Sequence, residues 1–202
     1  MVMASRAQRS DVIVRTAMRA ALAGMLTALF AATAAAGADH GCSYAATGEM
    51  RQVEHCASLD AAGQVHLKHD VRAALHYDAN GLASVYIDGG GWHYLTRDGR
   101  AAPVMSMDNG ADPFVDGRAR SPVGGKIGFI DRHLVLVIPA RYDGALPFEG
   151  GRAEVCIGCT LAPEGEHSAY VGGRWGCIDR HGRERGPLTP APGAGHACRK
   201  GG

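Results

Sequence analysis

Two cysteines three residues apart, Cys156 and Cys159, form the sharpest chemical motif in the sequence. A Cys-x-x-Cys pair is typical of a thiol-redox centre or of half a zinc site. A redox pair usually opens a helix, whereas the residues around this pair indicate a strand end followed by a loop. A zinc site needs further ligands, and only His167 and Cys177 follow nearby. The pattern therefore favours a disulfide that braces a loop, with metal binding or redox activity as alternatives.

Three common catalytic motifs are absent from the sequence. It has no Gly-x-Ser-x-Gly elbow, no His-Glu-x-x-His motif and no phosphate-binding glycine loop. The ten histidines are scattered, and His133 and His181 occupy equivalent positions in two internal repeats, which favours a role in turns. We therefore predict a protein that is not an enzyme, with no catalytic residues, no cofactor and no metal ligands.

The cysteine count indicates a disulfide framework. An even number of cysteines in an exported chain is typical of disulfide bonding, and the connectivity stays open from the sequence. The six disulfide candidates are Cys42, Cys56, Cys156, Cys159, Cys177 and Cys198.

Residues 1–38 have the layout of a secretory signal peptide. Four arginines precede an apolar run over residues 20–30, and small residues follow up to Ala38. This order predicts export to the periplasm or the medium, with cleavage near Ala36 or Ala38. The peptide starts at Met1 or, in a shorter form, at Met18. Because a membrane-spanning helix needs about 20 apolar residues, we expect no stable span after cleavage, the alternative being an uncleaved anchor.

The charge of the exported part excludes one class of partner. The whole chain carries 21 Lys and Arg against 20 Asp and Glu, and four arginines and one aspartate lie in residues 1–38. The remainder is therefore close to neutral and has no basic block that could follow a phosphate backbone. Nucleic acid is not expected as a partner.

A ten-residue phrase recurs along the chain. Residues 173–182 repeat residues 125–134 almost letter for letter, residues 91–99 are a looser copy, and a weaker copy ends at residue 63. The third clear copy carries an insertion between Cys156 and Ala169. A period of a few tens of residues indicates one small structural unit used several times.

Each unit has the features of a β-hairpin. Short apolar runs alternate with Gly, Asp and Asn, and helical periodicity is scarce. Residues 89–91, 124–125 and 172–173 are glycines between strand-like runs, which favours tight hairpin turns. The fold class expected is therefore all-β: an array of about three and a half hairpin repeats, either open or closed into a propeller-like ring.

The repeated phrase resembles the WG repeat of many bacterial proteins. Its form Gly-Lys/Arg-Trp-Gly-x-Ile-Asp-x-x-Gly continues in one copy as Ile-Pro-x-x-Tyr-Asp at residues 138–143. The resemblance covers residues 57–186, although Ile127 replaces the tryptophan in one copy and His93 replaces the second glycine in another. It implies an array of β-hairpins that serves as an interaction module, and it supplies no catalytic residues.

The resulting organisation has four parts: a signal peptide (1–38), an N-terminal cap (39–56), a WG-type repeat domain (57–186) and a Pro/Gly-rich tail (187–202). We expect an exported binding module whose partner is a protein or an envelope polymer. The alternative is an exported metal-binding or thiol-redox protein centred on Cys156 and Cys159. The candidates for the binding face are Trp92, Tyr94, Tyr170, Trp175, Glu164, Glu166 and His167.

Overall fold

The computed structural model describes residues 39–61, 63–165, 167–195 and 197–198. The predicted signal peptide, residues 1–38, lies outside the described residues. All described residues belong to one contact unit, Ala35–Gly202. Within the described part of the chain, no helix has the length and apolar character needed to cross a membrane.

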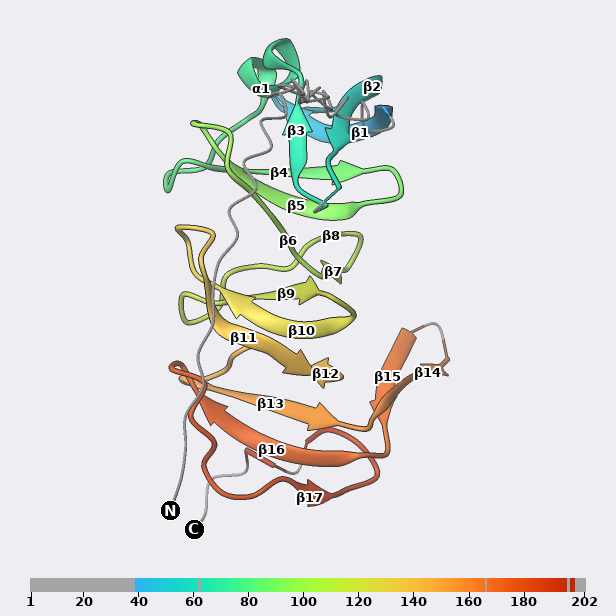
Figure 1. Ribbon diagram of the computed structural model, residues 1–202, viewed down its shortest axis with the longest axis vertical. Helices are drawn as coiled ribbons and strands as arrows, with labels where there is room; N and C mark the ends of the chain where they lie inside the picture. The colour runs from blue at the N-terminus through green and yellow to red at the C-terminus, as the bar shows by residue number, and fades with distance from the viewer. Residues whose placement is uncertain (1–38, 62, 166, 196, 199–202) are drawn as a thin grey trace, which may run out of the picture. The chain divides into compact units, whose positions relative to one another are not determined.

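The N-terminal half of this unit is a six-stranded antiparallel sheet with the strand order β3-β2-β1-β4-β5-β6 (Figure 1). A short helix, α1 (His69–Ala74), follows β3. The strands are β1 (Asp39–Ala46), β2 (Glu49–Leu59), β3 (Val65–Leu67), β4 (Leu82–Ile87), β5 (Gly91–Thr96) and β6 (Ala101–Pro103).

The rest of the unit consists of smaller antiparallel sheets that follow in chain order (Figure 1). A short ribbon pairs β7 (Ser106–Met107) with β8 (Gly110–Ala111). The next sheet contains β9 (Ala119–Val123), β10 (Lys126–Ile130) and β11 (Leu136–Tyr142). The last contains β12 (Gly144–Ala145), β13 (Arg152–Ile157), β16 (Arg174–Asp179) and β17 (Thr189–Pro190), and β14 (Thr160–Glu164) pairs with β15 (His167–Val171) outside it. The all-β class is confirmed.

Each clear copy of the repeated phrase forms the second strand of a strand pair. The pairs are β4–β5, β9–β10 and β13–β16. The glycines at 124 and 125 both have positive φ and form the predicted two-residue turn. The hairpin expected at Gly172 and Gly173 is wrong, because β15 pairs with β14 and β16 pairs with β13. The insertion separates the two strands of the third copy in sequence without separating them in space.

The turn after each repeated phrase has one geometry in all copies. The Leu134 amide donates to the Asp131 carbonyl oxygen (2.9 Å), and the Gly182 amide donates to that of Asp179 (2.9 Å). The same bond joins Gly63 to Asp60, which places the weakest copy at the β2–β3 connection. Residues 39–56, predicted as an N-terminal cap, form β1 and most of β2.

Separate hydrophobic cores lie between consecutive copies, because one hairpin cannot bury both of its faces. The largest side chains of the core between the second and third clear copies come from β10 and β11 and from the turn before β13. There Phe129 and Phe148 meet edge to face, with ring centroids 4.9 Å apart. A second core, which includes Ala102, Val104 and Ile130, joins the first clear copy to the second.

A glycine in the repeated phrase is required where two backbones approach closely. A methyl group on Gly128 would lie 2.5 Å from the Ile138 carbonyl oxygen. The β10–β11 register shifts at this point, which brings the β11 backbone against the glycine. The equivalent residue of the preceding copy, His93, pairs with Pro103 in a regular register, so a side chain fits there. His93 can therefore replace the glycine of the repeat pattern, because β5 and β6 pair without this register shift.

Trp175→Ala should lower the free energy of unfolding far more than Glu164→Ala. Trp175 is only 1% exposed, and truncating a buried aromatic costs about 3–5 kcal/mol. Glu164 is exposed on β14, so its loss should change stability by no more than about 0.5 kcal/mol. Urea unfolding of both variants measures the difference, and equal midpoints would show that the repeat register is misassigned.

Candidate functional site

The insertion in the third copy folds into a hairpin of its own. Strands β14 and β15 pair from Thr160 with Val171 at the base to Glu164 with His167 near the tip. The hairpin projects away from β13 and β16 (Figure 1). Leu161 is 60% exposed on it. This segment is therefore a surface extension of the repeat array, which the strand pairing within the copies does not require.

A disulfide between Cys156 and Cys159 closes the base of this hairpin. Both cysteines are buried, and Cys156 lies directly opposite Trp175 in the β13–β16 register. The Trp175 indole N–H donates to the Gly172 carbonyl oxygen (2.8 Å), which holds the ring beside the disulfide. The pair lies at the end of a strand and opens no helix. This environment favours the structural interpretation of the motif over redox exchange.

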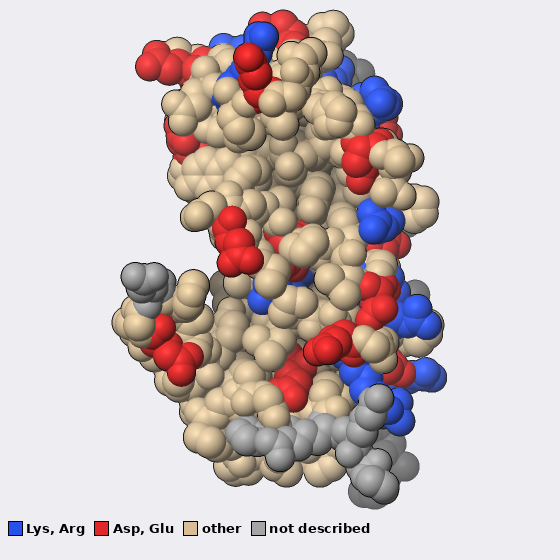
Figure 2. Space-filling view, turned by 180° about the vertical axis from the view of Figure 1, so that it is seen from behind, with Lys and Arg blue, Asp and Glu red and all other residues tan. Residues whose placement is uncertain are grey.

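A groove of about 540 Å³ runs beside the hairpin. We call it the hairpin groove. Side chains of the hairpin form one wall, Leu146 and Arg120 line the part nearest the repeats, and residues 192–194 form another wall. In the view of Figure 2 the hairpin stands at the left, apart from the neighbouring surface. Of the predicted binding residues, Glu164 and Tyr170 both line this groove.

Arg120 is buried, and a carboxylate of the same protein neutralises its charge. Its guanidinium forms a bidentate ion pair with Asp112, in which Nε lies 3.2 Å and 3.1 Å from the two carboxylate oxygens. Nη1 also donates to the Ala145 carbonyl oxygen (3.1 Å). The Asp112 carboxylate accepts a further bond from the Arg120 amide (2.7 Å). Arg120 therefore gives the groove a fixed wall and leaves its carboxylate partner satisfied.

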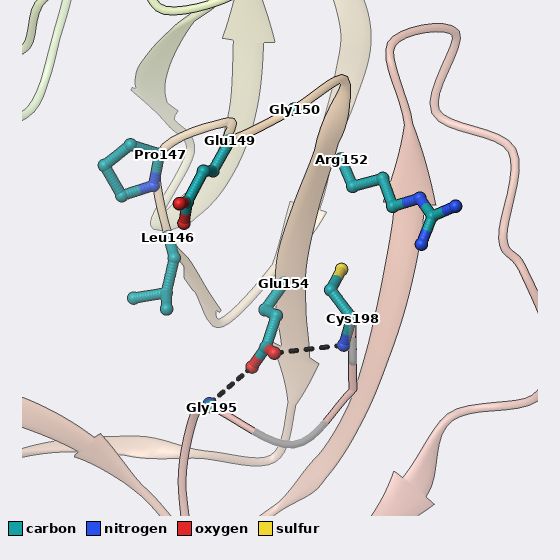
Figure 3. A pocket seen from close by; sticks show the side chains of 8 residues that line it. All are labelled: Leu146, Pro147, Glu149, Gly150, Arg152, Glu154, Gly195 and Cys198. Atoms are coloured by element: carbon teal, nitrogen blue, oxygen red, sulfur yellow. Dashed lines mark hydrogen bonds between the residues drawn. The ribbon is translucent and has the colours of Figure 1, made fainter. Parts of the chain in front are cut away.

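A second cavity of about 490 Å³ lies under the C-terminal segment (Figure 3). We call it the tail pocket. Glu154 of β13 is buried there, and its two carboxylate oxygens accept hydrogen bonds from the amides of Gly195 (2.6 Å) and Cys198 (3.0 Å). Arg152 extends away from Glu154 (Figure 3). The tail itself therefore supplies two of the donors that a buried carboxylate needs.

The disulfide between Cys177 and Cys198 secures the same segment. Cys177 lies opposite Glu154 in the β13–β16 register. Cys198 thus contacts two paired strands, through its sulfur to β16 and through its amide to β13. Ala191, Ala194 and Ala197 pack against the Trp175 cluster. The predicted tail, residues 187–202, contains β17 and these contacts, and its described part covers the last copy.

The other predicted binding residues lie in different surroundings. Trp92 and Tyr94 are half-buried against the core that joins the first two clear copies, where Trp92 meets Tyr86 edge to face. Trp175 is fully buried and offers no exposed ring. His167 is exposed beside Glu164, and Glu166 lies outside the described residues. The structure thus brings Glu164, Tyr170 and His167 to one hairpin and places Trp92 and Tyr94 elsewhere.

Three buried charged residues were missed by reasoning from the sequence: Arg120 and Glu154, which line these cavities, and Asp112, the partner of Arg120. When the repeats are aligned on Gly117 and Gly151, Arg120 and Glu154 occupy the same position, between apolar residues of a strand. A charge at a core position of a repeat was the signal that could have identified both. Its opposite sign in the two copies indicates that each copy satisfies this position with a different partner.

The remaining disulfide joins Cys42 to Cys56 and ties β1 to β2. All six predicted disulfide cysteines are therefore paired, in the pattern Cys42–Cys56, Cys156–Cys159 and Cys177–Cys198. Among the residues that the structure describes, no group of three or more His, Cys, Asp or Glu side chains is placed to hold a metal ion.

Comparison with known protein families identifies the repeat. Residues 127–158 match the family model described as the WG containing repeat. This segment runs from β10 to the end of β13, so it spans the second clear copy and the first strand of the third. Comparisons with curated proteins and with solved structures gave no match. The chain contains a WG repeat, as its internal phrase predicts.

Replacing Cys177 and Cys198 together by serine should release the tail from the last copy. Closing a loop of this length stabilises a protein by about 3 kcal/mol, and the Glu154 contacts depend on the same segment. Hydrogen exchange should then accelerate at the Gly195 and Cys198 amides. The double change Cys42→Ser with Cys56→Ser is the control, because that disulfide lies in the first sheet. Unchanged protection in the tail would show that Glu154 alone holds it.

Proposed function

We propose that this protein is an exported, non-enzymatic binding module. Its binding face is the β14–β15 hairpin with the hairpin groove, and its partner is a protein or an envelope polymer. The observation that carries the proposal is the insertion itself. It breaks the repeat period, forms a separate surface hairpin and is anchored by a disulfide at its base. Segments added to a repeated scaffold are frequent sites of function.

The composition of the hairpin supports a contact role. Leu161 and Val171 are exposed apolar side chains on it, and Glu164 and His167 add polar groups near the tip. Tyr170 lines the groove, and aromatic side chains contribute strongly to binding energies. A concave groove with a few polar groups beside an apolar strand suits an extended segment of a partner.

Export has support from two independent features. Three disulfides form readily in an oxidising compartment and are rare in the cytosol. The basic, apolar and small residues of 1–38 have the order of a signal peptide. Both features agree with a protein that acts in the periplasm or outside the cell.

The non-enzymatic assignment is supported by how the buried charges are used. Asp112 and Arg120 neutralise each other, and Glu154 accepts bonds from the tail. Catalytic groups need ionisable side chains poised toward a substrate. In this protein the buried ionisable groups around the two cavities instead hold neighbouring segments together.

A shortened hairpin tests the proposal. Because Leu161 and Tyr170 are paired, residues 162–169 can be replaced by Gly-Gly while the disulfide and the base of the hairpin remain. We expect the variant to fold with an unchanged far-UV spectrum and to lose the partners that the intact protein cross-links in a cell-envelope fraction.

A matched pair of point variants controls for loss of apolar surface. Leu161→Ser and Val135→Ser each remove one exposed aliphatic side chain, 60% and 51% exposed respectively. Only Leu161→Ser should weaken capture, because Val135 lies in the connection before β11. Equal capture by the intact protein, the shortened protein and Leu161→Ser would remove the hairpin from the binding face.

A further inference from the structure

The repeated turn places an arginine at the same position in each clear copy. Arg97, Arg132 and Arg180 each follow the first residue of the turn that ends β5, β10 and β16 respectively. All three are exposed. The array therefore presents the same cationic group repeatedly along the edge formed by these turns, which we call the turn edge. Lys and Arg side chains gather mainly along one side of the surface in Figure 2.

The carboxylates of Asp131 and Asp179, in the second and third of these turns, accept hydrogen bonds from backbone amides. The Asp131 carboxylate accepts from the amides of His133 (2.9 Å) and Val135 (3.0 Å). In the last turn, desolvation opposes ionisation of Asp179, but hydrogen bonds from Arg183 and His181 outweigh it and lower the pKa of Asp179 to about 2. These aspartates shape the turns while the arginines beside them extend into solvent.

Two of the arginines are supported by aromatic rings. The Arg97 guanidinium lies 4.4 Å from the centroid of the Tyr77 ring, and that of Arg132 lies 4.9 Å from the centroid of Phe114. Stacking uses the face of a guanidinium and leaves its N–H groups at the edge for oxyanion acceptors. Within the described residues, no ion pair joins Arg97 or Arg132 to a carboxylate. Asp78 contributes to the electrostatic surroundings of Arg132, but its oxygens accept from local amides.

Two shallow pockets meet at Arg97. The first, about 210 Å³, is lined by His69, Arg72, Tyr77 and Arg97, with no carboxylate among its lining residues. The second, about 320 Å³, is lined by Arg97, Arg100, Arg132 and His133 among others. It includes Asp98, whose carboxylate is bonded to Thr96 and Arg100. Because Arg97 lines both pockets, their basic side chains adjoin at this residue, and we call this set of basic side chains the cationic strip.

We propose that the turn edge binds an acidic polymer through Arg97 and Arg132, with Arg72 contributing at its N-terminal end. The ligand chemistry is a chain with repeated phosphate or carboxylate groups, which successive arginines contact one after another. The binding chemistry does not depend on the proposed export, which determines only whether such a polymer is met in the cell envelope. The site is distinct from the β14–β15 hairpin, so the two proposals fail separately.

Double-stranded DNA is the polyanion that the observations disfavour. The exported part of the chain is close to neutral overall, and the strip consists of a few arginines and histidines. Binding to a DNA backbone usually depends on many simultaneous Lys and Arg contacts. A short row of stacked guanidinium groups suits a flexible chain with more widely spaced charges.

The test measures binding of the full exported chain to polyphosphate and to polygalacturonate by biolayer interferometry, with neutral dextran as a blank. A charge-assisted hydrogen bond to arginine contributes enough that each loss should weaken binding about tenfold. We therefore expect Arg97→Gln and Arg132→Gln each to lower affinity by about that factor, and their combination to abolish detectable binding. Preference between the two polymers identifies the oxyanion.

Arg174→Gln is the matched control, because this substitution removes the same charge from an exposed residue. Arg174 begins β16, at the opposite end of the strand from the turn edge. It should change affinity by less than about twofold, and thermal unfolding of all variants should confirm folding. The proposal is overturned if neither polymer binds, if Arg97→Gln and Arg132→Gln behave like Arg174→Gln, or if DNA binds as tightly. The variant with the shortened hairpin should still bind the polymer. If this variant loses polymer binding, the polymer site lies on the hairpin.

Discussion

The buried ion pair between Asp112 and Arg120 is the interaction on which the stacking of the copies depends. Arg120 lies on β9, and its guanidinium reaches both Asp112 and the Ala145 carbonyl of the next copy. The Tyr94 hydroxyl of the preceding copy donates to the Asp112 carbonyl oxygen (3.1 Å). A buried charge is tolerated only when its partners are in place. The ion pair therefore ties the second clear copy to the third through Arg120, and the Asp112 backbone adds a contact to the first.

The contacts of the tail follow from the same constraint. Glu154 occupies the position of Arg120 one copy later, and residues after β16 provide its hydrogen-bond donors. These donors are the amides of Gly195 and Cys198 in the tail. The disulfide from Cys198 to Cys177 then holds these donors in position. A covalently fixed segment thus covers the third clear copy, where an exposed strand edge would otherwise favour pairing with other chains.

Much of this fold could be predicted from the sequence, because the repeated residues that form turns and strands act on their immediate neighbours. A glycine pair marked the turn at residues 124–125, and the Asp131 and Asp179 hydrogen bonds likewise join residues of one turn. These features depend on a few adjacent residues, so spacing suffices to find them. The repeat also predicted which strands pair, except where Gly172 and Gly173 connect two strands that have other partners.

The contacts between copies were less accessible, because they depend on residues far apart in the chain. The disulfide pattern needed the register that places Cys177 opposite Glu154. The role of Arg120 needed the approach of Ala145 from the next copy. The hairpin could be identified because it breaks the repeat period. The position of Tyr170 in the groove could not, because the groove is lined by residues far apart in the chain.

Urea unfolding of variants at the buried ion pair tests most directly whether it couples the copies. Asp112→Ala and Arg120→Ala each leave one buried charge without its partner, so each should lower the free energy of unfolding by about 3–5 kcal/mol. The combined variant Asp112→Leu with Arg120→Met removes both charges and should recover most of that loss. If each single variant stays within about 0.5 kcal/mol of the parent protein, the pair does not hold the array together and the account is contradicted.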